Sequence, residues 1–175
     1  MGTLQSLSAM TDLTSASAPP LGENDHLRGP EAAPLVIVYA DFTCGQCAIA
    51  ALALARAPVR VAYRHLVLTT RNRRALPLAV AAEAAGRQGA FWTFHDLIYR
   101  DQSHLDDPHI WQRCTELGLD LGRFEEDRRE QALTDRVRRQ TREGMRAGAA
   151  TTPLLVLPDG RLHQGAPDAG LLATL

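Results

Sequence analysis

Runs of hydrophobic residues separated by turn residues predict a strand, a helix and a second strand in succession. A continuous apolar and β-branched run covers 35–40, which is typical of a strand buried on both faces of a parallel sheet. Residues 41–43 break this run. The Ala- and Leu-rich stretch 44–56 predicts a helix that ends before Pro58, and 59–68 predicts the second strand. Together they form a βαβ unit, for which we expect a right-handed crossover.

Helical patterns then dominate the chain as far as residue 149. We expect helices over 75–86, 90–100, 107–117, 121–128 and 131–146. The third of these is predicted to begin with Asp107 as its N-cap and Pro108 as its first helical residue. In the last, the i, i+4 series Leu133, Val137, Thr141 and Met145 is expected to face inward.

The two ends of the chain have different patterns. A strand pattern returns at Pro153, 158–160 form a turn, 161–164 form the second arm of a hairpin, and 166–175 predict two turns of terminal helix. The hydrophobic residues of 1–33 follow neither a helical nor a strand period, which predicts a mostly disordered tail. Within that tail we expect a transient helical turn over 4–13 and a short strand near Leu27 and Arg28.

Composition narrows the class of protein. The 175 residues are 45% hydrophobic and 22% charged, which is ordinary for one packed domain, and no apolar run approaches a membrane span. The formal charge of −1 argues against a nucleic-acid binder. All 19 basic residues are Arg, so lysine-based catalysis is excluded. The weakly apolar start of the chain has no basic segment before it and is interrupted by Asp12, which argues against a secretory signal. We therefore expect a cytoplasmic location, with export left open. Separately, we expect a monomer.

The chemistry-bearing feature is a single Cys-x-x-Cys at the junction of strand and helix. Cys44 falls at the helix N-terminus, where free N–H groups and the helix dipole favour a thiolate. Cys47 returns to the same face one turn later, within disulfide reach. The sequence therefore predicts a redox pair in which Cys44 attacks and Cys47 resolves. Such a pair needs no cofactor, but it needs thiol or disulfide substrates and a recycling thiol partner.

Two other functions are compatible with this pair. A structural zinc site needs four ligands, and neither Cys114 nor the six His supply a second ligand pair at a helpful spacing. A redox-inactive protein-binding module is the second alternative. Cys114 itself lies among apolar neighbours in a predicted helix, and we expect a buried, inert thiol rather than a third redox partner.

Further residues are candidates for supporting roles. Thr152 and Pro153 precede the returning strand; a cis bond between them would bring the loop beside the cysteines and leave the Thr152 backbone free to pair with an extended substrate. Asp41 is either a proton relay or, as we favour, a helix cap or a partner of loop N–H groups. The His65 ring is expected in the core or at the sheet edge. Phe91, Trp92 and Phe94 are expected in the core between the helices and the sheet, although part of this stripe could line a substrate groove.

The order of these elements resembles the DsbA-like branch of the thioredoxin superfamily. The similarity covers roughly 25–170 and includes the lead-in DHLRGP at 25–30, YRHL at 63–66 and FWTFHDL at 91–97. It implies an α/β thioredoxin fold over 34–70 and 150–175, split by a helical insertion over 71–149. It also implies protein disulfide oxidoreductase activity, with the redox role on Cys44 and Cys47 and the cis-proline role on Pro153.

The residues between the cysteines set an expectation for reactivity. Gly45 and Gln46 bring no charge to the sulfur, and no Lys exists to help. We therefore expect the pKa of Cys44 to fall from about 8.5 only to roughly 5.5–7.5. That range describes a moderate oxidoreductase that could work as a cytosolic reductase, while the physiological direction stays open.

Overall fold

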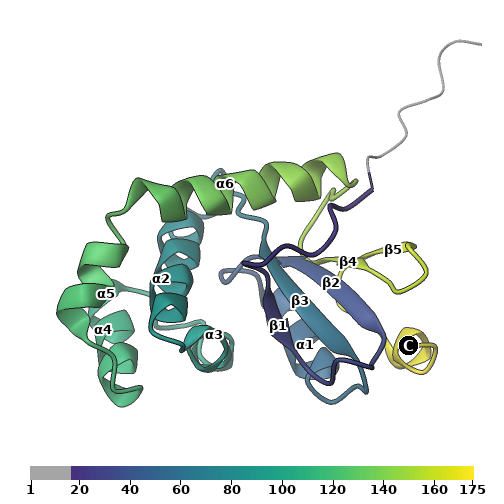
Figure 1. The fold of residues 1–175 in the computed structure, drawn as a ribbon, viewed down its shortest axis with the longest axis horizontal. Helices are drawn as coiled ribbons and strands as arrows, with labels where there is room; N and C mark the ends of the chain where they lie inside the picture. Colours follow the sequence, from purple (N-terminus) through teal and green to yellow (C-terminus); the bar gives the residue numbers. More distant parts are fainter. Residues whose placement is uncertain (1–16) are drawn as a thin grey trace, which may run out of the picture.

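A computed structural model describes residues 17–175 of the chain (Figure 1). One mixed sheet runs through it, in the order β1-β3-β2-β4-β5. Its strands are β1 (His26–Arg28), β2 (Leu35–Ala40), β3 (Arg60–His65), β4 (Leu154–Val156) and β5 (Leu162–Gln164). The expected helical turn over 4–13 lies outside the described residues.

The centre of the sheet follows from the βαβ pattern. β2 and β3 pair in parallel, from Leu35 opposite Arg60 to Ala40 opposite His65, and every other strand pair is antiparallel. β2 is buried from its second residue onward because it has neighbours on both edges and cover on both faces. Its carboxyl end therefore leads directly from the core into the Cys-x-x-Cys.

The helices are α1 (Gly45–Leu54), α2 (Ala75–Arg87), α3 (Phe91–Arg100), α4 (Asp107–Glu116), α5 (Leu121–Asp127), α6 (Gln131–Arg146) and α7 (Ala169–Leu172). In Figure 1, α2 to α5 stand beside the sheet, while α6 runs from α5 across to the sheet. All five helices α2 to α6 fall inside 71–149, where the sequence predicts an insertion. No helix within the described residues combines the length and apolar character needed to cross a membrane.

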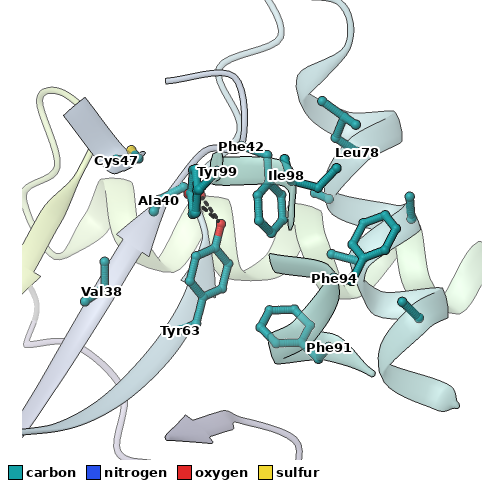
Figure 2. Close-up of a cluster of buried hydrophobic side chains, with 14 of the residues drawn as sticks. Val38, Ala40, Phe42, Cys47, Tyr63, Leu78, Phe91, Phe94, Ile98 and Tyr99 are labelled. Atoms are coloured by element: carbon teal, nitrogen blue, oxygen red, sulfur yellow. Dashed lines mark hydrogen bonds between the residues drawn. The ribbon is translucent and has the colours of Figure 1, made fainter. Parts of the chain in front are cut away.

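Two buried clusters hold these layers together. The larger one joins one face of the sheet to α1, α2 and α3, and includes Phe42, Tyr63, Phe91 and Phe94 (Figure 2). The smaller cluster lies on the opposite face of the sheet, around Tyr39 and Leu154. It includes Ala147, the residue that follows α6. Phe91 and Trp92 lie between helices and sheet as predicted, each against Tyr63 of β3, whereas the buried Phe94 packs against Phe124 of α5.

Part of the segment predicted as an N-terminal tail is ordered. The expected strand near Leu27 is present as β1, paired with β3. Before it, the buried guanidinium of Arg64 donates to the carbonyls of Pro19 and Pro20 at 2.8 and 2.9 Å and pairs with Asp25 at 2.8 Å. The prediction of disorder is therefore wrong for 17–33. The other domain boundaries stay predictions.

Two helix details also differ from expectation. The N-cap of α4 is Asp106, whose side chain accepts from the His109 N–H, so Asp107 and Pro108 lie within the first turn. In α6, Met145 is 50% exposed. An i, i+4 series drifts about 40° per step, so three steps carry the fourth member away from the buried stripe. Gln140 and Gly144 take the inward positions instead.

The chain's last elements are shorter than expected. α7 makes a single turn, and β3 ends at His65 because its partner β2 ends opposite it.

Candidate active site

Cys44 occupies the N-cap position of α1, with extended backbone angles of φ −97° and ψ 119°. The chain turns out of β2 through Asp41, Phe42 and Thr43, and the Cys44 N–H closes that turn on the Asp41 carbonyl at 3.1 Å. Cys44 is partly exposed, whereas Cys47 is 1% exposed one turn further along. The predicted difference in access between the two thiols is therefore present in the fold.

The surroundings of Cys44 favour its thiolate. A hydrogen bond from the Cys47 thiol is the strongest influence and lowers the pKa of Cys44 to about 5, against the opposing effect of partial burial. The Thr152 side chain and the backbone N–H groups of Cys47 and Gln46 lower it further. This value lies just below the expected 5.5–7.5. The hydrogen bond from Cys47 comes from the next turn of α1 and that from Thr152 comes from a distant loop, and the Gly-Gln dipeptide shows neither.

Cys47 has the opposite environment. Burial strongly raises the pKa of its thiol, and the neighbouring Cys44 thiolate raises it again. Its sulfur accepts the Asp41 N–H at 3.5 Å. Cys47 therefore stays protonated while Cys44 is ionised, so the pair holds one thiolate and one proton donor side by side.

A loop from the far end of the chain completes the site. The peptide bond between Thr152 and Pro153 is cis. The Cys44 thiol, when protonated, donates to the Thr152 carbonyl at 3.4 Å across 108 positions of sequence. The structure thus brings together Cys44, Cys47, Thr152 and Pro153, the residues that the sequence singled out.

Asp41 shapes the loop before the cysteines and does not cap the helix. One carboxylate oxygen accepts from the Thr43 N–H and hydroxyl, both at 2.8 Å, and the other accepts from the Leu68 N–H at 3.3 Å. The N-cap of α1 is Cys44, and it makes no side-chain capping bond. The favoured helix cap is therefore wrong, and bonding to loop N–H groups is correct. The proton-relay role stays a prediction.

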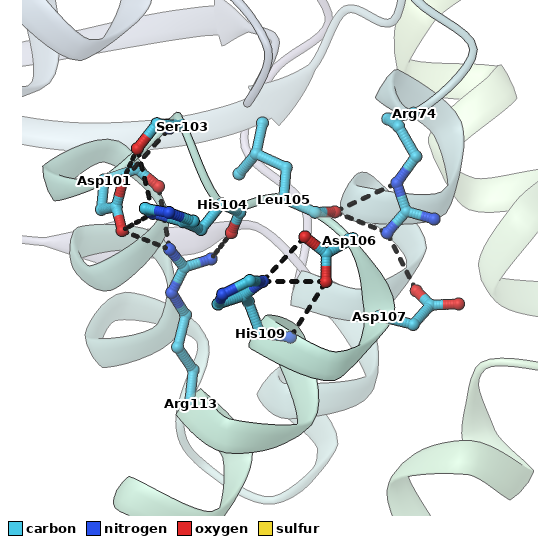
Figure 3. Close-up of polar contacts among 9 residues, drawn as sticks. All are labelled: Arg74, Asp101, Ser103, His104, Leu105, Asp106, Asp107, His109 and Arg113. Atoms are coloured by element: carbon cyan, nitrogen blue, oxygen red, sulfur yellow. Dashed lines mark hydrogen bonds and ion pairs between the residues drawn. The ribbon is translucent and has the colours of Figure 1, made fainter.

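Gln102 is a contact that the sequence analysis missed. Its side-chain amide donates to the carbonyls of Phe42 at 2.8 Å and Cys44 at 3.1 Å. The loop that carries Gln102 is fixed in turn, because Arg113 donates to the carbonyls of Asp101 and His104 and Arg74 donates to that of Leu105 (Figure 3). No local pattern around Gln102 signals this, since its partners lie 58 and 60 positions away.

The remaining candidates lie in the core. His65 is fully buried and pairs with Glu83 at 2.9 Å, and burial lowers the pKa of its ring. Cys114 is 0% exposed in α4, and burial raises the pKa of its thiol to about 11. The expectations of a core histidine and a buried thiol are confirmed. Among residues 17–175, no three or more His, Cys, Asp and Glu side chains are arranged to hold a metal ion.

Curated relatives share the chain over most of its length. It is 36% identical over 149 residues to Na(+)/H(+) antiporter NhaA 3 of Salinispora tropica, which covers 82% of this chain and 23% of the antiporter. It is 37% identical over 163 residues to Na(+)/H(+) antiporter NhaA of Herminiimonas arsenicoxydans, covering 90% and 26%. The chain therefore spans about a quarter of the length of these relatives.

Solved structures show the same fold at lower identity. A thioredoxin-like oxidoreductase from Silicibacter pomeroyi DSS-3 superposes with a TM-score of 0.77 at 23% identity, covering 87% of this chain and 90% of that one. The thiol-disulfide exchange protein alpha-DsbA2 from Wolbachia pipientis has a TM-score of 0.76 at 18% identity, covering 86% and 84%.

The family assignment rests on the sequence itself. Residues 35–175 match the DSBA-like thioredoxin domain family, which includes the Cys-x-x-Cys, the helices between β3 and β4, and the Thr-Pro loop. The resemblance and the thioredoxin fold with inserted helices are thereby confirmed. The chain belongs to the DSBA-like thioredoxin domain family.

Proposed function

We propose that this domain exchanges disulfides through Cys44 and Cys47, with Cys44 attacking and Cys47 resolving. The Cys44 thiolate attacks one sulfur of a substrate disulfide, forms a mixed disulfide and releases one substrate thiolate. Cys47 then loses its proton and attacks the Cys44 sulfur. That step breaks the mixed disulfide, releases the second substrate sulfur as a thiol and leaves a Cys44–Cys47 disulfide. Two electrons pass to the substrate, and the same steps reversed oxidise a dithiol.

The observation that carries this proposal is the opposite tuning of two adjacent thiols. Cys44 has a pKa of about 5 and is partly exposed, so it is ionised and reachable near neutral pH. Cys47 is buried with its pKa raised, so it keeps its proton until the mixed disulfide has replaced the neighbouring thiolate. A metal site or an inert binding surface gives no reason for this difference.

The stabilised Cys44 thiolate also affects whether the pair tends to oxidise or to reduce its substrates. Whatever stabilises the thiolate stabilises the reduced pair, and so makes its disulfide more oxidising. A pKa of about 5 for Cys44 lies between the values of about 7 in thioredoxin and about 3.5 in DsbA. We therefore propose a pair of intermediate oxidising strength. Cytoplasmic location, expected from the sequence, stays a prediction.

Substrate chains would bind beside the cis peptide. The Thr152 carbonyl lies 3.4 Å from the Cys44 sulfur, so an extended segment paired with the Thr152 backbone would lie within reach of Cys44. This favours protein disulfides over isolated small thiols, because the main chain of a peptide supplies the matching donors and acceptors.

Reduction of insulin by dithiothreitol tests the activity. The wild-type chain should accelerate insulin precipitation, Cys44→Ser should lose the acceleration, and Cys114→Ser, which changes a buried thiol of α4, should retain it. Cys44→Ser with undiminished activity would overturn the proposal. Metal analysis of the purified chain tests the zinc alternative, which requires stoichiometric metal.

A second role follows from the curated relatives. The matched segment makes up only about a quarter of these relatives, which are named Na(+)/H(+) antiporters. In the relatives, a segment similar to this domain is therefore part of a protein named as an antiporter. We propose on this ground that the domain exchanges disulfides with a membrane antiporter. Cys47→Ser should trap mixed disulfides on Cys44 in cells, with an antiporter among the partners identified by mass. Trapped partners without any antiporter would count against this role and leave the exchange chemistry standing.

A further inference from the structure

A cavity of about 160 Å³ is lined by residues of α1, the sheet and α3, and neither Thr152 nor Pro153 is among them. Val38 and Ala40 of β2, Tyr63 of β3, Cys47 of α1 and Tyr99 of α3 are among its lining residues, and Figure 2 shows how these side chains lie. The lining also includes Arg28 at the end of β1, the two residues that follow it, and Ala55 and Ala57 just beyond α1. The cavity does not belong to the exchange site as described, although its wall includes the buried sulfur.

Small side chains explain why the space is open. Ala40 on the sheet, Ala51 and Ala55 on the helix side, and Ala57 beyond it all line the cavity. Larger residues at such facing positions normally fill the layer between a helix and a sheet. An engineered apolar cavity of about 150 Å³ stays dry and takes up benzene, so a space of this size suits one aromatic ring.

Most polar groups of the lining already have partners. The Tyr63 hydroxyl donates to the Ala40 carbonyl and the Tyr99 hydroxyl to the Asp41 carbonyl, each at 3.3 Å. Arg28 donates to the Trp92 carbonyl at 3.1 Å and to Asp96 at 2.9 Å. A charged ligand would therefore find no free counter-charge among these groups.

His95 is the exception. Its Nδ1 lies 2.8 Å from an Asp96 carboxylate oxygen, and burial lowers the pKa of the ring, so the ring is neutral with its proton on Nδ1. The other nitrogen, Nε2, then carries a lone pair, and no residue in 17–175 donates to it. His95, a residue with an unused hydrogen-bond acceptor, is thus one of the residues that line this mostly apolar cavity.

We propose that this cavity is a binding site for a small neutral phenol, its ring held between Ala51 and Tyr63 and its hydroxyl donating to His95 Nε2. The volume of the cavity limits the ligand to one aromatic ring. Because the charged groups of the lining are already paired, the ligand should be neutral. Because His95 Nε2 carries a free lone pair, the ligand should carry a hydroxyl that can donate to it. The proposal does not depend on thiol–disulfide exchange.

Phenol itself is the probe, with toluene as a ring of similar size that lacks the donor. Trp92 lines the cavity, whereas Trp111 lies on the surface. In a Trp111→Phe background, phenol should therefore change the fluorescence of Trp92 saturably. In wild-type protein, phenol should shift the ¹⁵N resonance of His95 Nε2 and toluene should not. A His95 resonance that responds equally to both compounds, or to neither, would overturn the proposal.

Cavity-filling variants locate the binding. Ala51→Leu should weaken phenol binding at least tenfold. Ala55→Leu changes a more exposed residue of the lining and should do the same if the first variant folds poorly. Ala53→Leu is the matched control, since Ala53 lies on the same helix outside the cavity lining. Phenol binding that survives both filling variants, or that Ala53→Leu weakens equally, would show that the ligand sits elsewhere.

Discussion

Cys44 and Cys47 are the same residue type three positions apart, and their difference comes from where α1 begins. At the N-cap, Cys44 faces the free N–H groups of the first turn, whereas Cys47 lies under that turn against the core. Burial then acts on both thiols in the same sense, but only Cys44 has enough donors to overcome it. One turn of helix thus separates an acidic thiol from a protonated one.

Thr152→Val removes the side-chain hydroxyl that donates a hydrogen bond to the Cys44 sulfur, with little change in side-chain shape. Losing a neutral hydrogen bond of roughly 0.5–1.5 kcal/mol should raise the titration midpoint of Cys44 by roughly half to one pH unit from its value of about 5. Thiolate absorbance of the reduced protein against pH measures this. Thr151→Val, at the neighbouring position, serves as the control. An unchanged midpoint in Thr152→Val would rule out the threonine hydroxyl as a donor to Cys44.

The lowered pKa of Cys44 in the folded wild-type protein makes the stability of the reduced protein depend on pH. The folded pKa of Cys44, about 5, is below its ordinary value of 9.0, so between these pH values the unfolded chain binds a proton that the folded one does not. Stability from this thiolate therefore rises with pH across that window and is lost as pH falls through 5. The difference in Tm between reduced wild type and Cys44→Ser should grow from pH 5 to pH 9. A constant difference would contradict the shift.

At the scale of elements, the loop between α3 and α4 holds the entry to α1. Arg113 and Arg74 fix the backbone of 101–105, and Gln102 extends from it to the carbonyls of Phe42 and Cys44. These carbonyls belong to the turn that aims the first N–H groups of α1 at the Cys44 sulfur. The inserted helices therefore help to position the redox pair, although Gln102 touches neither sulfur.

Gln102→Ala should loosen this turn and raise the titration midpoint of Cys44 by roughly half a pH unit, since fewer helix N–H groups would point at the thiolate. Gln112→Ala removes an exposed glutamine of α4 that bonds only Glu116 among the described residues, and it should leave the midpoint unchanged. Thiolate titration of the two variants compares them directly. If they titrate alike, Gln102 has no positioning role.

The sequence patterns predicted where these helices and strands lie in the chain better than they predicted the contacts between them. The apolar run of β2 and the helical stretch after it are local signals, so the strand–helix junction at Cys44 could be placed from the sequence. The cap of α4 was misplaced by one position because adjacent Asp106 and Asp107 both suit it. Gln102 could not be predicted, because its role depends on a loop brought from 58 positions away.

At the scale of the whole molecule, α6 ties the inserted helices to the sheet. Gly144 of α6 lies against the Tyr39 ring on β2, so close that a Cβ there would come within 2.8 Å of Tyr39 Cδ1. Earlier in the same helix, Arg136 pairs at 3.0 Å with the buried Glu83 of α2, which also pairs with His26 and His65 of the sheet. None of these long-range contacts has a local signature, so the sequence indicated most of the buried face of α6 but not the residues against which it packs.

Gly144→Ala should therefore destabilise the protein despite the better helix propensity of alanine. Overpacking against the aromatic ring should cost about 1–3 kcal/mol in the free energy of unfolding. Denaturant unfolding measures the change. Gly170→Ala in α7, where the nearest atom is an ordinary 3.4 Å away, should change stability much less. Equal stabilities for wild type and Gly144→Ala would show that α6 can shift away from Tyr39 at little cost.

The attacking role of Cys44 is tested most directly by reacting reduced Cys47→Ser and reduced Cys44→Ser with oxidised glutathione at neutral pH and following adducts by mass. The exposed thiolate of Cys44 should form a stable mixed disulfide rapidly in Cys47→Ser. The buried, protonated Cys47 should react at least a hundredfold more slowly in Cys44→Ser, by the order of magnitude that a small thiolate fraction and poor access imply. Comparable rates in the two variants, or faster reaction at Cys47, would contradict the assignment of attacking and resolving thiols.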